Sequence, residues 1–303
     1  MSDIRHGRVR ANGIEFHVAR TGAGRPLVLL HGWPEFWLTW EPVMQRLAGR
    51  FELIAPDLRG FGESEKPDAG PSDQAGAETH AADMLALIEA LGLRRVGVVA
   101  HDVGGGVVQV MARQRPELLA GIFLFDTPHP GIGPRFADPG HLKEIWYQSF
   151  HQLPWAASLV GASRDSCRAY FAHFLRHWSV RRDAFDDVLE TWVDNFMRPG
   201  NLQGGFNWYI SANTARLAVM RGETPALPPI AVPTCVRWGA GDPVLKVAWA
   251  DRLGETFSEL DFAPFEGVGH FPHREAPDRA AEEIAGFFER AWPSPNPLPR
   301  GEG

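Results

Sequence analysis

The sequence predicts an α/β protein with a mostly parallel sheet and an inserted helical segment. Short apolar runs alternate with helical stretches in the first and last parts of the chain, and the alternation stops between His129 and Pro229. Strand–helix alternation is typical of a parallel sheet covered by helices. A helical insertion in such a chain is expected to lie over the carboxyl ends of the strands, where open α/β sheets bind ligands.

The individual elements follow from hydrophobic periodicity. Pro26–Leu30 is a continuous apolar run, as expected of a strand that is buried on both faces. Apolar residues recur with helical spacing from His80 to Leu91. The predicted strands are 26–30, 51–56, 96–100, 121–125, 234–238 and 260–262, and the predicted helices around them are 80–91, 247–253 and 277–291.

Glycine and proline mark the limits of the insertion. Pro128-His129-Pro130-Gly131 precedes an aromatic-rich helical stretch, and Leu227-Pro228-Pro229 follows it. We therefore divide the chain into a first core part (1–128), a helical cap (129–229), a second core part (230–292) and a tail (293–303). The tail is rich in Pro and Gly and is predicted to be disordered.

Composition excludes several classes of partner. The net charge of −7 and the pI of about 5.9 argue against nucleic acid or an anionic membrane as the main partner. Only two cysteines occur, Cys167 and Cys235, and no Cys/His cluster suggests a zinc site. We see no secretory signal in residues 1–20 and no apolar run near the roughly 20 residues of a membrane span. A cytoplasmic protein without a zinc site is expected.

Asp102 is the first candidate catalytic residue. It follows the predicted strand 96–100, and the small residues Ala100 and Gly104 lie two positions before and after it. This spacing is that of a nucleophile elbow, a sharp strand-to-helix turn that presents a nucleophile. A carboxylate in that position can attack a saturated carbon and form an ester. The alternative is that Asp102 only caps the helix that follows it.

Asp242 and His270 complete a candidate triad. Each lies in a glycine-rich loop after a predicted strand, and the chain order is nucleophile, acid, histidine. In this arrangement His270 is the general base, and Asp242 orients its imidazole ring and stabilises the protonated form. Asp126, directly after the strand at 121–125, is an alternative acid. We favour Asp242 because of its Gly-rich loop.

Backbone N–H groups are expected to form an oxyanion hole. The N–H groups of Trp33, in the loop after the first strand, and of Val103, next to Asp102, can converge on a developing negative charge. The alternative is a simple turn at Gly32 and Pro34. We also expect Trp33 and Pro34 to contact the substrate.

These motifs resemble the cap-bearing epoxide hydrolases of the α/β-hydrolase fold, over about Ile14 to Ala291. The segment 31–37, HGWPEFW, is similar to the HGxP motif of that family, and His101-Asp102-Val103-Gly104 is similar to its nucleophile motif. Two cap segments, 144–153 and 204–209, resemble the regions that supply the ring-opening tyrosines in bacterial members.

Two of only three tyrosines lie in those cap segments, Tyr147 and Tyr209. The resemblance implies that both hydrogen-bond the epoxide oxygen, and that Trp208 contacts the substrate beside them. The alternative is that both rings merely pack inside the cap, where Tyr170 is also expected to pack. Tyr209 is followed by Ile210, where many relatives carry Arg, so the local cap contacts differ.

The resemblance implies an enzyme without metal or cofactor that opens an epoxide to a vicinal diol. Asp102 forms a hydroxyalkyl ester, and a water activated by His270 hydrolyses it. The aromatic cap predicts a small neutral, apolar or aromatic epoxide as substrate.

A haloalkane or haloacid dehalogenase with the same nucleophile is the alternative function. Haloalkane dehalogenases typically place Trp after the nucleophile, and fluoroacetate dehalogenases place Arg there, whereas this chain has Val103. A binding protein without activity would not need the complete set of catalytic residues. A serine esterase would need a serine at position 102.

Overall fold

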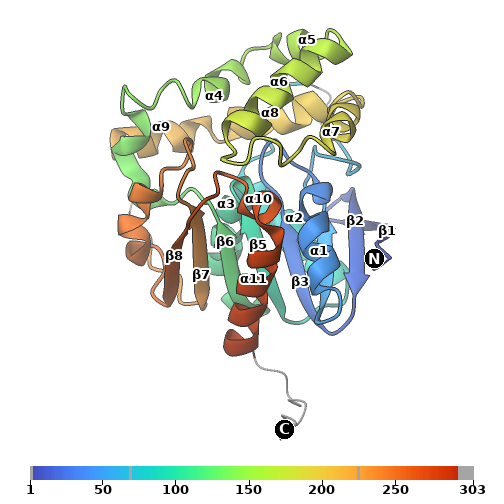
Figure 1. Ribbon diagram of the computed structural model, residues 1–303, viewed down its shortest axis with the longest axis vertical. Coiled ribbons are helices and arrows are strands. Elements are labelled where there is room, and N and C mark those ends of the chain that lie inside the picture. Colours follow the sequence, from blue (N-terminus) through green and yellow to red (C-terminus); the bar gives the residue numbers. More distant parts are fainter. Residues whose placement is uncertain (1–2, 68–69, 224–225, 293–303) are drawn as a thin grey trace, which may run out of the picture.

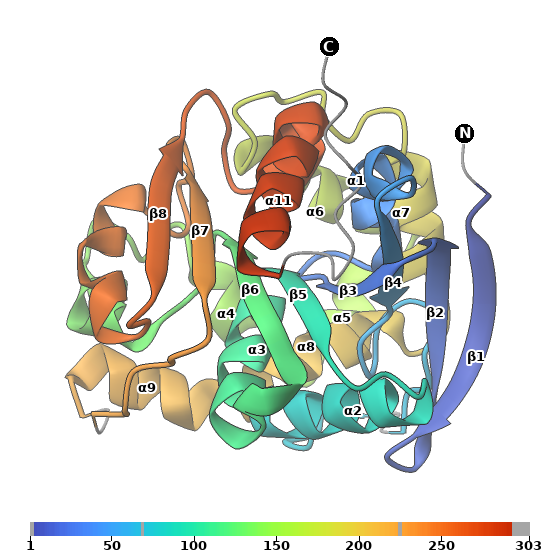
Figure 2. The same ribbon diagram turned by 90° about the horizontal axis from the view of Figure 1, so that it is seen from below.

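An eight-stranded sheet crosses the molecule, and helices cover both of its faces (Figures 1 and 2). The computed structural model describes residues 3–67, 70–223 and 226–292. The strand order is β1-β2-β4-β3-β5-β6-β7-β8, and all neighbours from β4 to β8 are parallel. The strands are β1 Arg5–Ala11, β2 Ile14–Gly22, β3 Arg25–Leu30, β4 Phe51–Pro56, β5 Val96–His101, β6 Leu119–Phe125, β7 Thr234–Gly239 and β8 Leu260–Phe265.

The hydrophobic core has two parts, one on each face of the sheet. Alternate residues of a strand point to opposite faces, and in β5 Val98 belongs to one part and Val99 to the other. Helices α1 and α11 cover one face, and α2 and α3 cover the other (Figure 2). These helices are α1 Glu41–Leu47, α2 Ala77–Ala90, α3 Val103–Gln114 and α11 Pro277–Ala291, and the short α10 Pro272–Glu275 precedes α11.

The predicted elements of the core are present, with one correction. The six predicted strands correspond to β3–β8, and the final helix has the expected bounds. The segment expected as a helix over 247–253 is a 3-10 segment, η4 Val247–Glu255, and its helical backbone is interrupted at Arg252, where φ is −114°. Side-chain periodicity does not distinguish the two helix types over so short a stretch.

The sequence-based prediction missed the antiparallel strands β1 and β2. β1 is mostly exposed and carries polar residues, so it has no continuous apolar run. The available signal was the Asn12-Gly13 dipeptide, which joins the two strands with φ of 44° and 81°. Asn-Gly between strands is a strong indication of a hairpin.

A group of helices lies above the carboxyl ends of the parallel strands (Figure 1). They are α4 Trp146–Phe150, α5 Ala156–Val160, α6 Arg164–His177, α7 Leu189–Phe196, α8 Asn201–Ser211 and α9 Asn213–Arg221, after the 3-10 segment η3 Pro130–Ala137. None of the described residues between 129 and 229 lies in a strand. We propose the limits 1–128, 129–229 and 230–292 for the core parts and the cap on this basis.

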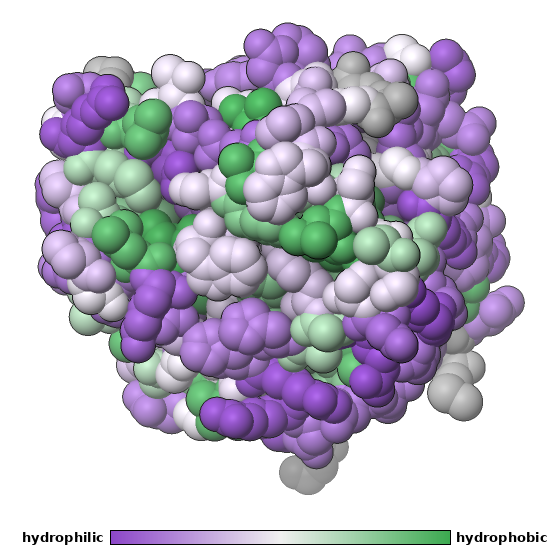
Figure 3. Space-filling model, turned by 90° about the horizontal axis from the view of Figure 1, so that it is seen from above, coloured by the Kyte–Doolittle hydropathy of each residue, from purple (hydrophilic) through white to green (hydrophobic). Residues whose placement is uncertain are grey.

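The outer surface of this cap combines polar and apolar side chains (Figure 3). Large apolar residues of the α4–α5 region are exposed on it, among them Trp146, Leu153, Trp155 and Leu159. Within the described ranges, no helix is long and apolar enough to cross a membrane. The predicted disordered tail, 293–303, lies outside the described residues.

Helix α3 lies very close to strand β3 at Gly104. A Cβ atom added to Gly104 would lie 2.5 Å from the carbonyl oxygen of Leu30 and 2.9 Å from that of His31. Both neighbours are backbone atoms at the end of β3, so they cannot move aside without displacing the strand. The small residue two positions after Asp102 is therefore needed for packing.

Gly104→Ala is expected to lower the free energy of unfolding by about 1 to 3 kcal/mol, the usual range for overpacking. Gly106→Ala is the matched control, because its Cβ would meet only Trp208, at 3.9 Å. Alanine is favoured over glycine within a helix by about 0.5 to 1 kcal/mol, so the control should not be destabilised. Urea unfolding of both variants measures the difference, and equal stability of the two would contradict the packing argument.

Candidate active site

Asp102 occupies the turn between β5 and α3 with a strained backbone. Its φ of 46° and ψ of −115° are rare for a residue other than glycine and are found at functional sites. The side chain makes no cap hydrogen bond to the described backbone of α3. Instead, its Oδ1 accepts a hydrogen bond of 3.1 Å from the backbone N–H of Trp33. The geometry therefore supports the interpretation of Asp102 as a nucleophile rather than as a helix cap.

The loop after β3 lies against this carboxylate because it contains Gly32. A Cβ atom at Gly32 would lie only 2.6 Å from the Cβ of Asp102. The absence of a side chain thus allows the neighbouring N–H of Trp33 to reach the carboxylate. Val103, whose N–H is the second predicted oxyanion-hole donor, is the first residue of α3. The Trp33 N–H contacts the Asp102 carboxylate in space, and Val103 follows Asp102 directly in the chain.

His270 lies between two carboxylates. Its Nδ1 is 2.7 Å from Oδ2 of Asp242, and its Nε2 is 3.9 Å from Oδ2 of Asp102. Asp242 is held in place because its Oδ1 accepts hydrogen bonds from the backbone N–H groups of Val244 and Leu245. The structure therefore brings together the predicted nucleophile, base and acid.

The two carboxylates stabilise the protonated form of His270. Burial by itself lowers the pKa of the imidazole, but the Asp242 carboxylate outweighs it and Asp102 adds to the increase, which raises the pKa to about 9. His270 therefore carries a positive charge at neutral pH.

Asp126, the alternative acid, has a different set of contacts. It follows β6, and its Oδ1 accepts a hydrogen bond of 2.9 Å from the N–H of Gly239. One ligand-type atom from each of Asp126, Asp242 and His270 falls within 4.8 Å of the others. Burial, and after it the charge of Asp242, raises the pKa of Asp126 well above its usual range. Asp126 therefore resists ionisation, and Asp242 is the carboxyl group in direct contact with His270.

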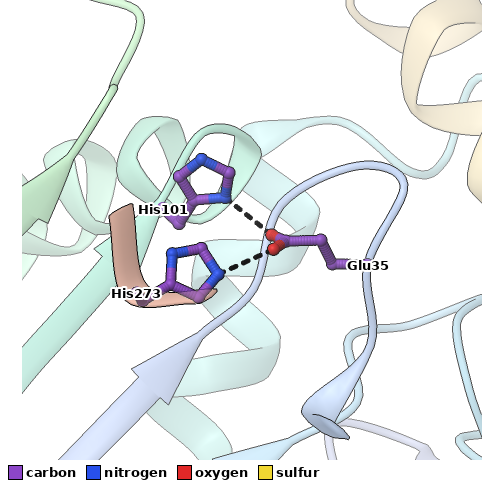
Figure 4. Close-up of side chains that lie close together, drawn as sticks. All are labelled: Glu35, His101 and His273. Carbon is purple, nitrogen blue, oxygen red and sulfur yellow. Dashed lines mark hydrogen bonds and ion pairs between the residues drawn. The ribbon is translucent and has the colours of Figure 1, made fainter. Parts of the chain in front are cut away.

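A second buried cluster supports the site from below and is shown in Figure 4. Glu35 is fully buried, and each of its carboxylate oxygens has two neighbours. Oε2 accepts from Nδ1 of His101 at 2.6 Å and from the N–H of Gly32 at 2.7 Å. Oε1 accepts from Thr39 at 2.6 Å and lies 2.8 Å from Nε2 of His273.

This cluster connects the three loops of the site. Nε2 of His101 lies 2.7 Å from the backbone carbonyl oxygen of His270, and His101 directly precedes Asp102. Burial would raise the pKa of Glu35, but His101 and then His273 outweigh burial and hold it well below its usual range. An ionised Glu35 therefore joins the loop after β3, the nucleophile turn and the histidine loop.

The predicted tyrosines come from two cap helices. Tyr147 lies on α4 and Tyr209 on α8, both are buried, and their ring centroids are 5.4 Å apart. Both line a cavity of about 290 Å³ that also contains Asp102 and Trp208. Burial, more than any nearby charge, raises the pKa of both phenols, so both hydroxyl groups keep their protons. The cavity thus has a carboxylate on the core side and two neutral phenols on the cap side.

Trp33 and Pro34 are buried but are not among the described residues that line this cavity. The indole ring of Trp33 stacks on Tyr147 at a centroid distance of 5.0 Å, so it supports the tyrosine from behind. The carbonyl oxygen of Pro34 accepts a hydrogen bond from the indole N–H of Trp192. Their direct contact with substrate stays a prediction, whereas Trp208 lies on the cavity wall.

The sequence-based reasoning gave no role to several residues of the site. Gln148 donates from Nε2 to the hydroxyl oxygen of Tyr147 at 3.3 Å and accepts from Arg216 at 3.1 Å. Glu275 accepts hydrogen bonds from the N–H groups of Gly269 and Phe271, on either side of His270. Glu35 lay inside a quoted motif, but only the fold reveals that it is buried beneath two histidines.

Glu35→Gln is expected to lower the free energy of unfolding by about 3 kcal/mol, because it removes the charge at the centre of a buried cluster and replaces one of two acceptor oxygens with an NH2 donor that faces other donors. The control is Glu282→Gln on the exposed side of α11, with an expected change within about 0.5 kcal/mol. Denaturant unfolding at pH 7 measures both. A loss in Glu35→Gln no larger than in the control would show that the cluster contributes little.

The comparisons with known proteins agree with this geometry. Residues 25–277 match the alpha/beta hydrolase fold family. The soluble epoxide hydrolase of Corynebacterium sp. (strain C12) is 33% identical over 95% of this chain and 98% of its own length. Epoxide hydrolase 2 of Siraitia grosvenorii is 36% identical over 70% of this chain and 74% of its own length.

Solved structures give the same picture. The epoxide hydrolase CorEH without ligand superposes with a TM-score of 0.79, at 28% identity, over 95% of this chain and 99% of that one. Cfl2 from Burkholderia cenocepacia superposes with a TM-score of 0.80, at 28% identity, over 94% and 96%. As its motifs predicted, the chain belongs to the α/β-hydrolase fold family and, within it, to the epoxide hydrolases, which are hydrolases of ether bonds.

Proposed function

We propose that this protein hydrolyses an epoxide to a vicinal diol through a covalent ester of Asp102. One observation carries the proposal: the Asp102 carboxylate and the two phenols of Tyr147 and Tyr209 line the same cavity. A carboxylate nucleophile facing two proton donors suits a ring whose carbon is attacked while its oxygen is protonated. The relatives named epoxide hydrolases support the same reaction.

The first half of the reaction is ring opening. Tyr147 and Tyr209 hydrogen-bond the epoxide oxygen, and one phenol gives its proton to that oxygen as the ring C–O bond breaks. Oδ1 of Asp102 is engaged by the N–H of Trp33, so Oδ2 is the oxygen free to form the new bond to carbon. The product of this half is a hydroxyalkyl ester and a phenolate.

Ester formation changes the charge around His270. The Asp102 carboxylate helps to keep the pKa of His270 at about 9, and the ester has no charge. The pKa of His270 therefore falls when Asp102 is alkylated, and the imidazole gives up a proton more readily. Protons are conserved in the site when His270 loses one proton and the phenolate gains one. His270 is then neutral and can act as a base.

The second half of the reaction is ester hydrolysis. Neutral His270 takes a proton from a water molecule whose oxygen attacks the carbonyl carbon of the ester. The charge that develops on Oδ1 is stabilised by the N–H groups of Trp33 and Val103. The bond between that carbon and Oδ2 then breaks, and His270 gives its proton to the departing diol oxygen. The Asp102 carboxyl group, which now carries the hydroxyl of the attacking water, gives its proton to His270, and this restores both the Asp102 carboxylate and the protonated imidazole.

The residues that line the cavity indicate the class of substrate. Apolar residues form much of the lining, among them Ile132, Phe136, Trp208 and Val219. They support an epoxide whose body is apolar or aromatic, since such a cavity gains free energy by losing water from apolar surface. Cys167 and Cys235 are free thiols, which is compatible with the cytoplasmic location that we propose.

His270→Gln is expected to form the ester and fail to hydrolyse it, because glutamine cannot act as the base. Intact mass after addition of an aryl epoxide should increase by the mass of one epoxide molecule. His173→Gln, at an exposed position of α6, is the control and should return to its unmodified mass. An unmodified His270→Gln protein that is folded and binds the epoxide would contradict the covalent mechanism.

Replacing Tyr147 and Tyr209 together with Phe is expected to lower kcat/KM for epoxides by about 10²- to 10⁴-fold, the usual contribution of proton donation. Tyr170→Phe removes the remaining tyrosine hydroxyl, which contacts His151 rather than the cavity lining, and should change kcat/KM by less than about threefold. Steady-state diol formation measures both. Unchanged turnover in the double variant would show that the phenols are not proton donors.

A further inference from the structure

A positively charged side chain without an acidic partner lies in the wall of the active-site cavity. Arg216, on α9, lines the same cavity as Asp102 and the two tyrosines. Its Nη1 donates to the amide oxygen of Gln148 at 3.1 Å, and its Nη2 donates to that of Asn213 at 3.0 Å. Its Nε is buried and has no hydrogen-bond partner among the described residues.

The surroundings of Arg216 differ from those of its neighbours. Arg221, on the same helix, lies 3.8 Å from Glu223, and Arg135, on the adjacent η3, lies 2.9 Å from Asp251. In the described part of the chain, no carboxylate lies within 4.0 Å of the Arg216 guanidinium. The side chains that accept its hydrogen bonds, Gln148 and Asn213, are neutral amides, so its charge is not compensated locally.

An uncompensated charge is costly in a partly buried place. Removing a cation from water costs free energy unless a counter-charge or full hydrogen bonding replaces the water. Burial lowers the pKa of Arg216, which reflects that cost, although a guanidinium stays protonated at neutral pH. A ligand that brings an anion to this wall would supply the missing counter-charge and would find a planar group suited to an oxyanion.

We infer that the natural substrate is an epoxide that carries a carboxylate at the end away from the ring, and that Arg216 binds this carboxylate. The inference rests on the proposed epoxide hydrolysis and specifies its substrate. It replaces the expectation of a neutral substrate with that of an apolar body that has one anionic end.

The position of Arg216 suits such a molecule. Asp102 comes from the turn after β5 in the core, whereas Arg216 comes from the cap helix α9 above it (Figure 1). A substrate whose ring lies between Asp102 and the two phenols can therefore extend along the cap side of the cavity and present its carboxylate to Arg216. Ile132, Phe136 and Val219 line the same cavity and can contact the apolar part between these ends.

Arg216 also contacts the machinery for ring opening. Gln148, which accepts from Arg216, donates to the hydroxyl oxygen of Tyr147. A purely positioning role for Arg216, through Gln148 and Tyr147, would affect every epoxide equally. A substrate-binding role would affect anionic epoxides far more than neutral ones, and this difference is what an experiment must measure.

The test compares two aryl glycidyl ethers that differ only in the para substituent, a carboxylate in one and a carboxamide in the other. We expect the wild-type protein to prefer the carboxylate in kcat/KM. Arg216→Met should lower the ratio of the two kcat/KM values by about 10- to 100-fold, as expected for loss of a hydrogen-bonded ion pair. Arg216→Lys, which keeps the charge, should retain part of the preference.

Arg221→Met is the matched control, because Arg221 lies on the same helix with its side chain 62% exposed. Its ratio should equal that of the wild type. Added salt should raise KM for the carboxylate in the wild type but not in Arg216→Met, because ions screen the attraction to the guanidinium. Equal losses for both epoxides in Arg216→Met, or no wild-type preference for the carboxylate, would overturn the inference.

Binding measurements separate this inference from the proposed reaction. If the wild type turns over neither epoxide, the proposed function fails, and calorimetry with the same two compounds then decides the inference. Tighter binding of the carboxylate that is lost in Arg216→Met would support an anion site, and equal affinities would overturn it. Thermal unfolding confirms that each variant is folded, and Arg216→Gln replaces Arg216→Met if the latter is not.

Discussion

The buried Glu35 carboxylate is the interaction on which the geometry of the site depends. It accepts hydrogen bonds from the loop after β3 through Gly32, and from the nucleophile turn through His101. His101 in turn contacts the backbone of His270, so loops from three distant parts of the chain share one charged centre. A carboxylate in a fully buried place is stable only when its lone pairs are occupied, and here two histidines, a threonine and a backbone N–H occupy them.

The Glu35 cluster holds the loops that carry His270 and Asp102, and the carboxyl groups next to His270 then set its pKa. Backbone N–H groups fix the Asp242 carboxylate, burial and the charge of Asp242 raise the pKa of the neighbouring Asp126, and the carboxylates of Asp242 and Asp102 raise the pKa of His270. The raised pKa of Asp126 follows from its position, because two adjacent buried carboxylates repel each other when both are ionised. The pKa of His270 therefore depends on the state of Asp102, and in the proposed reaction each half changes the chemistry available to the next.

Much of the fold and of the site could be predicted from local sequence, for identifiable reasons. Continuous apolar runs indicate the buried parallel strands. The small residues around Asp102 indicate a close packing contact, which the structure has between Gly104 and the end of β3. The chain order of Asp102, Asp242 and His270 indicates a triad because parallel strands bring their carboxyl ends to one edge of the sheet. Tyr147 and Tyr209 stand out because tyrosine is rare in this chain.

Other features could not be predicted, because they arise from contacts between residues far apart in the sequence. Nothing near Glu35 in the chain shows that His273, more than two hundred residues later, will lie against it. The exposed strand β1 has no apolar pattern, since it is the edge strand of the sheet and most of its side chains are exposed. Arg216 looks like an ordinary surface residue of a helix until α9 is placed over the cavity, where no described acid pairs with it.

The two oxygens of Asp102 have different surroundings, and this determines which of them is replaced during the proposed reaction. Oδ1 is engaged by the Trp33 N–H, which leaves Oδ2 as the atom that bonds to substrate in the proposed reaction. Hydrolysis at the carbonyl carbon then releases Oδ2 within the diol and puts an oxygen from water in its place. In each cycle of the proposed reaction one oxygen of Asp102 is replaced by an oxygen from water, while the other stays with the protein. The nucleophile is therefore consumed and regenerated at every turnover.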